Sequence, residues 1–311
     1  MTLTRTITTT LVRYLVTIWV ASVLIFLLIR VIPGDPAAVA LGITATPEAI
    51  AQLQTQLGTD RPLPAQYLSW IAGMTTGDFG TSLSSGQDIS PLVIDRLQVS
   101  LILVGCSIVL SLLIAIPLGV LAARRGGTVI STASQIGIAI PSFLAGILLV
   151  AVFAVGLGWL PANGWIPPDQ HFGGFLQRLI LPVLALTAVQ ASILTRYVRS
   201  AVVDVMGEDF MRTARSKGMS LGRALRVHGL RNAALPVLTV TGVQLTSLVI
   251  GAVVIEQVFV LPGIGSMLLE SVSNRDLTAV QSIVMVLVVF TLVVNMAVDL
   301  LYQVLDPRIR R

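Results

Sequence analysis

The sequence predicts an all-α polytopic membrane protein with six transmembrane helices. Hydrophobic residues make up 55% of the 311 positions and charged residues only 11%, and the mean hydropathy is +0.90. Such a chain has too little polar surface to cover a soluble globule. Six apolar runs have about the length that a helix needs to cross a bilayer. They span about residues 9–31, 98–123, 132–158, 178–200, 235–260 and 279–304.

Three prolines lie within or at the start of these spans, at Pro117, Pro141 and Pro182. A proline interrupts helical hydrogen bonding, but a helix bundle absorbs the kink where neighbouring helices satisfy the freed backbone groups. The sequence shows no internal repeat, no low-complexity tract and no soluble domain. We therefore expect one transmembrane domain over residues 1–311.

The distribution of the twenty Lys and Arg residues predicts that both termini are cytoplasmic. In this orientation fifteen of them lie on the inner side and five on the outer side, where ten carboxylates also lie. The five outer residues are Arg30, Arg61, Arg96, Arg178 and Arg275. Cytoplasmic segments carry the excess of positive charge in membrane proteins. Because this topology explains the formal net charge of +5, the charge implies no nucleic-acid partner.

The first apolar run has some features of a secretory signal. It is too long for one, however, and it leads into Arg30 and Pro33 rather than into a small-residue cleavage site. We expect it to be an uncleaved membrane anchor.

Three predicted outer segments are candidates for a platform that receives an external partner. The longest, residues 32–96, is long for a loop without function. It contains a helical pattern from Pro47 to Gly58, whose end residues suit a helix, and then the Gly- and Ser-rich stretch TGDFGTSLSSGQDIS. The second is short, aromatic and rich in Pro and Gly, and the third contains LPGIG before an amphipathic pattern from Met267 to Val272. The alternative is that these loops only pack over the helix bundle.

The predicted cytoplasmic loop over residues 201–234 concentrates positive charge between two apolar spans. Its bases, which follow Glu208 and Asp209, are Arg212, Arg215, Lys217, Arg223, Arg226 and Arg231. A first short helix is predicted from about Glu208 to Lys217, because acids at its start and bases at its end suit the helix dipole and Gly218 can stop it. A second short helix is predicted to begin after the N-cap Ser220, with Leu221, Ala224 and Leu225 on one face.

Two short amphipathic helices at the membrane surface are suited to bind another protein. The alternative is a basic loop that only sets the topology and contacts lipid headgroups. The residues alone leave both interpretations open.

Several kinds of catalytic site are absent from the sequence. It has no G-x-x-x-x-G-K-[ST] phosphate-binding loop, so the chain is not itself an ATPase. His171 and His228 lie on predicted opposite sides of the membrane, and there is no H-E-x-x-H or paired-Cys motif. The single Cys106 excludes an internal disulfide, and among the carboxylates only Asp299 is expected to approach bilayer depth. We expect no catalytic residue, cofactor or metal in this chain.

Four motifs occur in order along the chain. They are GDFGTS (Gly77–Ser82), EDFMRTARSKG (Glu208–Gly218) followed by HGLRNAALP (His228–Pro236), EQVFVLPGIG (Glu256–Gly265) and LLYQVLDPRIR (Leu300–Arg310). With six spans, this set resembles the permeases of binding-protein-dependent ABC importers of the dipeptide, oligopeptide and nickel branch, over essentially the whole chain. The similarity is closest to the first permease subunit of a dipeptide system.

One motif departs from the general importer consensus, in which Glu-Ala-Ala precedes the glycine. Arg212, Thr213 and Ala214 occupy the three corresponding positions here, so the glutamate is absent. The distance from Gly218 to Pro236 is also longer than in the general pattern. Both features resemble the peptide branch, and they argue against transferring a glutamate-specific contact.

The resemblance implies the type I ABC importer permease fold and a mechanism. Two ATPase subunits, or one tandem ATPase, would bind ATP and Mg in the cytoplasm and hold the loop of this chain in a groove. A homologous second permease would complete the pathway as a heterodimer, and an extracytoplasmic binding protein would deliver the substrate. The chain itself would be a non-catalytic, multi-pass subunit of a prokaryotic cytoplasmic membrane, in contact with membrane lipid.

The resemblance also assigns roles to individual residues. Ala214 is expected to be the small residue at a tight contact with the ATPase, Gly218 to allow the turn, and Arg212, Arg215 and Lys217 to form charge-assisted contacts. The coupling loop comprises Glu208, Asp209, Arg212, Thr213, Ala214, Arg215, Lys217 and Gly218. The outer-partner candidates are Asp78, Phe79, Pro262 and Gly263.

Polar side chains within the spans are candidates for lining the pathway. They are Gln190, Thr195, Gln244, Thr246, Ser247 and Asn295. The alternative for each is an interhelical hydrogen bond. Members of the resembled family import dipeptides, longer peptides, nickel complexes and in some cases haem, and we expect dipeptides or short oligopeptides here.

Two other classes of protein remain as alternatives. A stand-alone secondary transporter would need buried charges and paired inverted repeats near the midplane, and the spans hold almost no midplane charge. A membrane scaffold would keep the basic loop but would need no pore.

Overall fold

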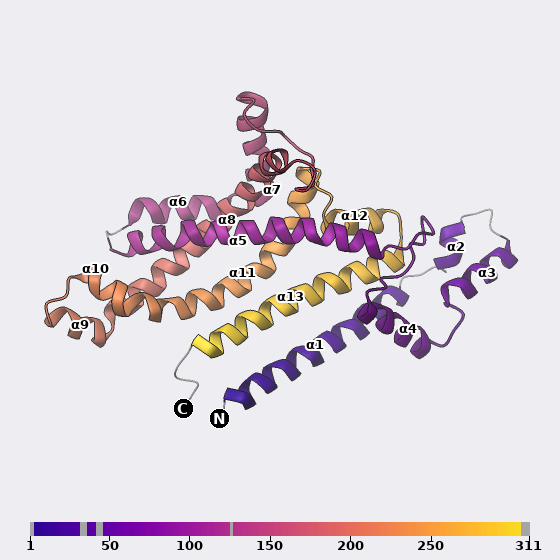
Figure 1. Cartoon of the computed structure of the whole chain (residues 1–311), viewed down its shortest axis with the longest axis horizontal. Coiled ribbons are helices and arrows are strands. Elements are labelled where there is room, and N and C mark those ends of the chain that lie inside the picture. Colours follow the sequence, from indigo (N-terminus) through magenta and orange to yellow (C-terminus); the bar gives the residue numbers. More distant parts are fainter. Residues whose placement is uncertain (1–2, 32–35, 42–45, 125–126, 306–311) are drawn as a thin grey trace. The chain divides into compact units, whose positions relative to one another are not determined.

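The computed structural model describes residues 3–31, 36–41, 46–124 and 127–305 (Figure 1). Within these ranges every regular element is a helix, and the only β interaction is an isolated bridge between Thr81 and Asp88. The predicted all-α class is therefore confirmed. The chain folds as two compact units, one comprising residues 1–10, 100–261 and 294–311 and the other residues 11–99 and 262–293.

Five single helices among the described residues are long and apolar enough to cross a membrane. They overlap the first, second, fourth, fifth and sixth predicted spans. They belong to α1 (Leu3–Val31), α5 (Ser90–Arg124), α8 (Phe172–Gly207), α11 (Leu230–Val258) and α13 (Leu277–Leu305). Pro117, Pro182 and Pro236 lie inside these helices without ending them.

The third predicted span is not one helix. It consists of α6 (Thr128–Ala139) and α7 (Ser142–Leu149), which continues as the π-helix η1 (Val150–Gly156), and the two parts are bent by 97°. Ile140 and Pro141 between them are extended, because a proline disfavours helical geometry at the residue before it. The described residues thus hold six spans only if this bent pair counts as one.

The first unit is built around α8, which packs against α6, α7 and α11. Glycines allow close helix contact at two of its faces. A Cβ atom on Gly119 of α5 would lie 2.6 Å from Cβ of Val198, and one on Gly137 of α6 would lie 2.1 Å from Oγ of Ser192. Membrane helices commonly associate through such small residues.

The second unit contains the short helices α2 (Pro36–Leu41), α3 (Pro47–Leu57), α4 (Leu63–Thr76) and α12 (Ile264–Ser273). In α3 the Oγ1 atom of Thr46 accepts from the backbone N–H of Ala49, and Gly58 ends the helix with φ +68°. This confirms the predicted helix between Pro47 and Gly58, and α12 confirms the amphipathic pattern from Met267. The core of this unit comprises Ile89, Val93, Ile264, Met267, Ala279, Ile283 and Val286.

Candidate functional site

The predicted coupling loop contains a short helix, α9 (Asp209–Ser216), which begins directly after α8. Glu208 separates the two helices because its backbone is extended, with φ −70° and ψ 149°. Asp209 lies in the first turn of α9 and Arg215 in the last, an arrangement that suits the helix dipole. The first of the two predicted short helices is therefore confirmed.

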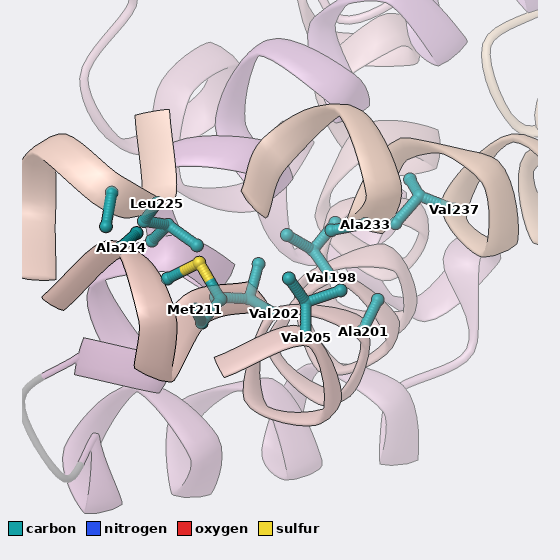
Figure 2. Close-up of a cluster of buried hydrophobic side chains, with 10 residues drawn as sticks. Val198, Ala201, Val202, Val205, Met211, Ala214, Leu225, Ala233 and Val237 are labelled. Atoms are coloured by element: carbon teal, nitrogen blue, oxygen red, sulfur yellow. The ribbon is translucent and has the colours of Figure 1, made fainter. Parts of the chain in front are cut away.

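One face of α9 is buried within the chain. Met211 is fully buried and Ala214 is 6% exposed, and both belong to a cluster in which α9 packs against α8 and against α10 and η2, which lead into α11 (Figure 2). The small size of Ala214 suits packing inside the chain, and its contact with a partner ATPase stays a prediction. The cluster comprises Val198, Ala201, Val202, Val205, Met211, Ala214, Ala224, Leu225, Ala233 and Val237.

The other face of α9 is charged and exposed. Arg212 and Asp209 form an ion pair of 3.5 Å with side chains that are 77% and 96% exposed, so the pair contributes little stability. Thr213, Arg215 and Lys217 are also exposed. This face presents several positively charged donors that could form charge-assisted hydrogen bonds with carboxylates of another chain.

The C-terminal end of α9 is closed around Gly218. The backbone N–H of Gly218 donates to the carbonyl oxygen of Arg215 (3.0 Å), and that of Met219 donates to the carbonyl oxygen of Ala214 (3.2 Å). Gly218 adopts φ +85°, the left-handed conformation that this type of helix ending requires. The prediction that Gly218 stops the helix is confirmed.

The second predicted short helix is not separate. After Ser220 the chain forms α10 (Leu221–Ala224) and the π-turn η2 (Leu225–Gly229), and it continues directly into α11. Together they form one helical run from Leu221 to Val258. The predicted start after Ser220 is confirmed, and the predicted apolar face is part of a longer stripe that Ala224, Leu225 and Ala233 bury along this run.

The pathway candidates fall into different environments. Gln190 is 4% exposed, and its Nε2 atom has no hydrogen-bond partner among the described residues; Thr195 is also buried. Nδ2 of Asn295 donates to Oγ1 of Thr246 (3.2 Å), which is the interhelical hydrogen bond that the alternative interpretation expected. Gln244 is half-buried and Ser247 exposed on α11, so these two remain predictions for residues on a pathway.

The outer-loop candidates are held by a network in the second unit. Oδ1 of Asp78 accepts from the backbone N–H of Gly80 (2.9 Å), and the side chain is exposed. Phe79 is half-buried, and its carbonyl oxygen accepts from Oγ of Ser282 (2.7 Å). Pro262 is half-buried and Gly263 buried. Of the four candidates, Asp78 is thus the one with an exposed side chain.

Asp276 organises the GDFGTS motif, a role that our sequence analysis missed. Its buried carboxylate accepts from Oγ of Ser82, from the backbone N–H of Leu83 (3.1 Å) and from that of Ala279 (3.1 Å). It therefore caps the start of α13 and anchors the loop after Phe79. Nothing local in the sequence marks this pairing, because the partners lie about two hundred positions apart.

Asp88 closes the same loop. Its Oδ1 atom accepts from Oγ (2.6 Å) and from the backbone N–H (2.9 Å) of Ser90. These hydrogen bonds, first from the side chain and then from the backbone, lower the pKa of the Asp88 carboxyl below its ordinary value.

A cavity of about 700 Å³ lies in the second unit beside Asp78 and Phe79. Arg30 projects into it and donates to Oε1 of Gln66 (2.9 Å) and to Oε1 of Gln281 (3.0 Å). Arg61 also lines it. Both polar and apolar side chains line the cavity, which is large enough for a small ligand.

Glu256 is a second carboxylate whose contact sequence reasoning missed. It lies in the last turns of α11, is 1% exposed and accepts from Oγ of Ser100. Asp299, the carboxylate expected near the inner end of the sixth span, lies in α13. Among the described residues no group of His, Cys, Asp and Glu has the arrangement of a metal site.

These apolar helices and the charged segment between α8 and α11 define a polytopic helical membrane protein. Residues 107–311 match the family described as "Binding-protein-dependent transport system inner membrane component", and residues 3–104 match "Binding-prot-dependent transport system membrane comp, N-term". The chain is 38% identical over 295 residues to the oligopeptide transport system permease protein AppB of Bacillus subtilis, with 93% of each chain covered.

It is also 39% identical over 301 residues to the glutathione transport system permease protein GsiC of Salmonella choleraesuis, with 94% of this chain and 95% of the relative covered. The chain therefore belongs to the family of inner-membrane components of binding-protein-dependent transport systems. The resemblance drawn from its motifs is confirmed, as are the type I ABC permease fold and the location in a prokaryotic inner membrane. Membership also implies a transport complex with other subunits.

Proposed function

We propose that the chain forms half of the translocation pathway of an ATP-driven importer of dipeptides or short oligopeptides. The peptide substrate is supported by relatives whose names specify oligopeptide and glutathione transport. Within this proposal the chain is a non-catalytic subunit with both termini in the cytoplasm. A homologous permease forms the other half, and an extracytoplasmic binding protein delivers the peptide to the outer loops around Asp78.

The observation that carries the proposal is that α9 has one face buried within the chain and one face that is charged and exposed. Its inner face, with Met211 and Ala214, packs against α8 and against α10 and η2, while its outer face presents Arg212, Arg215 and Lys217. A force on the outer face would therefore act on α8 and on the start of the helical run Leu221–Val258. Closure of the partner ATPases, which bind ATP and Mg, would in this way switch the pathway between outward and inward openings.

Subunit composition tests the proposal most directly. The chain, expressed with its native chromosomal neighbours and purified in mild detergent, is expected to retain one further permease and two ATPase domains. Recovery as a lone folded chain or as a homo-oligomer would instead favour a stand-alone transporter. The substrate is tested by uptake of labelled dipeptide and tripeptide against nickel and haem in cells with and without this chain.

A charge reversal tests the role of α9. In Arg215→Glu the exposed donor becomes an acceptor, and we expect peptide-stimulated ATPase activity to fall about tenfold or more, since one hydrogen bond to a charged group contributes about 1.5–3 kcal/mol. Arg231→Glu, an equal change at an exposed site in α11, is the control. Equal loss in both variants would point to a general effect of charge and not to a specific contact.

The topology has a separate test. A reporter fused after Arg311 should be active only in a cytoplasmic assay. Activity on the outer side of the membrane would contradict the proposed orientation and would place α9 away from any cytoplasmic ATPase.

A further inference from the structure

A cavity of about 380 Å³ lies within the first unit. It is lined by the first two turns of α6, by Ala122 of α5 and by five residues of α8, namely Thr195, Arg196, Tyr197, Arg199 and Ser200. Its polar side chains include Ser131 and Ser134 from α6 and Arg196 and Arg199 from α8. No acidic residue lines it, so the two arginines at its wall have no carboxylate beside them in this cavity.

Two polar atoms of this cavity are buried without a hydrogen-bond partner in the described part of the chain. They are Nε of Arg199 and Oγ of Ser131. Native proteins rarely leave a buried donor unpaired, and the cost is highest when the donor belongs to a charged group. Because the two residues come from different helices and line the same cavity, a small movement of their side chains would bring both donors to one acceptor-rich anion there.

The surroundings of the cavity suit an anion at the membrane surface. Arg196 and Arg199 follow the apolar run of α8, and Tyr197 lies between them at the cavity wall. Arginine and tyrosine at the end of a transmembrane helix are typical of headgroup depth. Ser131 lies in the first turn of the twelve-residue helix α6, whose positive dipole end adds to the attraction for an anion.

We propose that this cavity binds a phosphate group, held by Arg196 and Arg199 with Ser131 as a further donor. Guanidinium groups recognise phosphate oxygens through charge-assisted hydrogen bonds. Two sources share this chemistry, the headgroup of an anionic phospholipid and free inorganic phosphate. The site is independent of the peptide substrate and of the exposed face of α9.

Native mass spectrometry and thermal unfolding of the purified transporter test the proposal, with phosphatidylglycerol and inorganic phosphate as separate probes. We expect one molecule of a probe to be retained and to raise the unfolding temperature. Each arginine near a membrane surface contributes about a fivefold effect on lipid affinity. Arg196→Gln combined with Arg199→Gln should therefore weaken binding by about 25-fold.

A matched double variant, Arg223→Gln with Arg226→Gln, removes the same charge from exposed positions outside the cavity and should bind as the wild type does. Ser131→Ala, which keeps both charges, should weaken binding about threefold or more through loss of a hydrogen bond, and it serves if the arginine variant does not fold. Arginine-dependent retention of phosphatidylglycerol identifies a lipid site, and arginine-dependent binding of inorganic phosphate alone identifies free phosphate as the ligand. Unchanged binding in both cavity variants, or an equal loss in the surface control, would overturn the proposal.

Discussion

The backbone N–H of Met219 donates to the carbonyl oxygen of Ala214 across a distance of 3.2 Å. This hydrogen bond folds the chain back at the end of α9 and turns it toward α10. The turn passes through Gly218 at φ +85°, so the direction in which α9 presents its charged face depends on one backbone conformation.

Gly218→Val should disrupt this turn. A β-branched residue in the left-handed conformation costs about 1–2 kcal/mol, and a Cβ at this position meets no atom within 4 Å, so the cost arises from the backbone alone. We expect loss of peptide uptake and of ATPase coupling with the protein still inserted in the membrane. Gly207→Ala, at a helical glycine whose Cβ also meets nothing, should leave uptake unchanged. Normal uptake in Gly218→Val would contradict the role of this turn.

Ala214→Leu should loosen α9 from α8 and from α10 and η2. Added methylene groups in a packed core cost about 1–3 kcal/mol, because Met211 and Leu225 occupy the surrounding space. Thr213→Leu adds bulk to the exposed neighbouring position and should change stability by no more than about 0.5 kcal/mol. Thermal unfolding in detergent distinguishes them. If the two variants unfold alike, Ala214 is not confined as the structure describes.

Gly119→Ala should separate α5 from α8. The new Cβ atom would lie 2.6 Å from Cβ of Val198 and 2.9 Å from the carbonyl oxygen of Thr195, and relieving this contact should cost about 1–3 kcal/mol. Gly105→Ala on the same helix meets nothing within 4 Å and should be neutral or slightly stabilising. The measurement is again the unfolding temperature, and an equal effect at both positions would refute the close contact.

Asp276→Ala should release the loop that carries the GDFGTS motif. The substitution leaves the backbone N–H groups of Leu83 and Ala279 without their acceptor, and unsatisfied buried groups cost about 1–3 kcal/mol each. We expect faster limited proteolysis between residues 76 and 90. Glu270→Ala removes an exposed carboxylate of α12 and should not change the cleavage rate. Protection equal to the wild type in Asp276→Ala would show that the loop is held by other contacts.

The spans and caps were predictable because local chemistry determines them. Apolar runs of the right length indicated the helices that cross the membrane, and Gly218 and Gly58 indicated helix ends because few other residues accept a positive φ. The bend after Ala139 was harder to predict. A straight helix and a bent pair of helices with the same residues have the same hydropathy. Pro141 indicates that the helix breaks there, but it does not indicate the angle between the two parts.

Two features could not be derived from a single sequence. The continuity of α10, η2 and α11 depends on burying Ala224 and Ala233 against α8, which compensates for placing arginines along the helix. The contact of Ser82 with Asp276 joins residues far apart in the chain. Both depend on tertiary packing, which overrides local patterns.

The uninterrupted run from Leu221 to Val258 has 38 residues, and at about 1.5 Å per residue it is roughly 57 Å long. A helix of this length can act as a lever, because a small rotation at one end moves the other end a long way. A rotation of about 5° at the end beside α9 displaces the opposite end by roughly 5 Å when the run moves as one body. The π-helix at Leu225–Gly229 lies close to the driven end, where its wider turn can change the angle at which the run leaves α9.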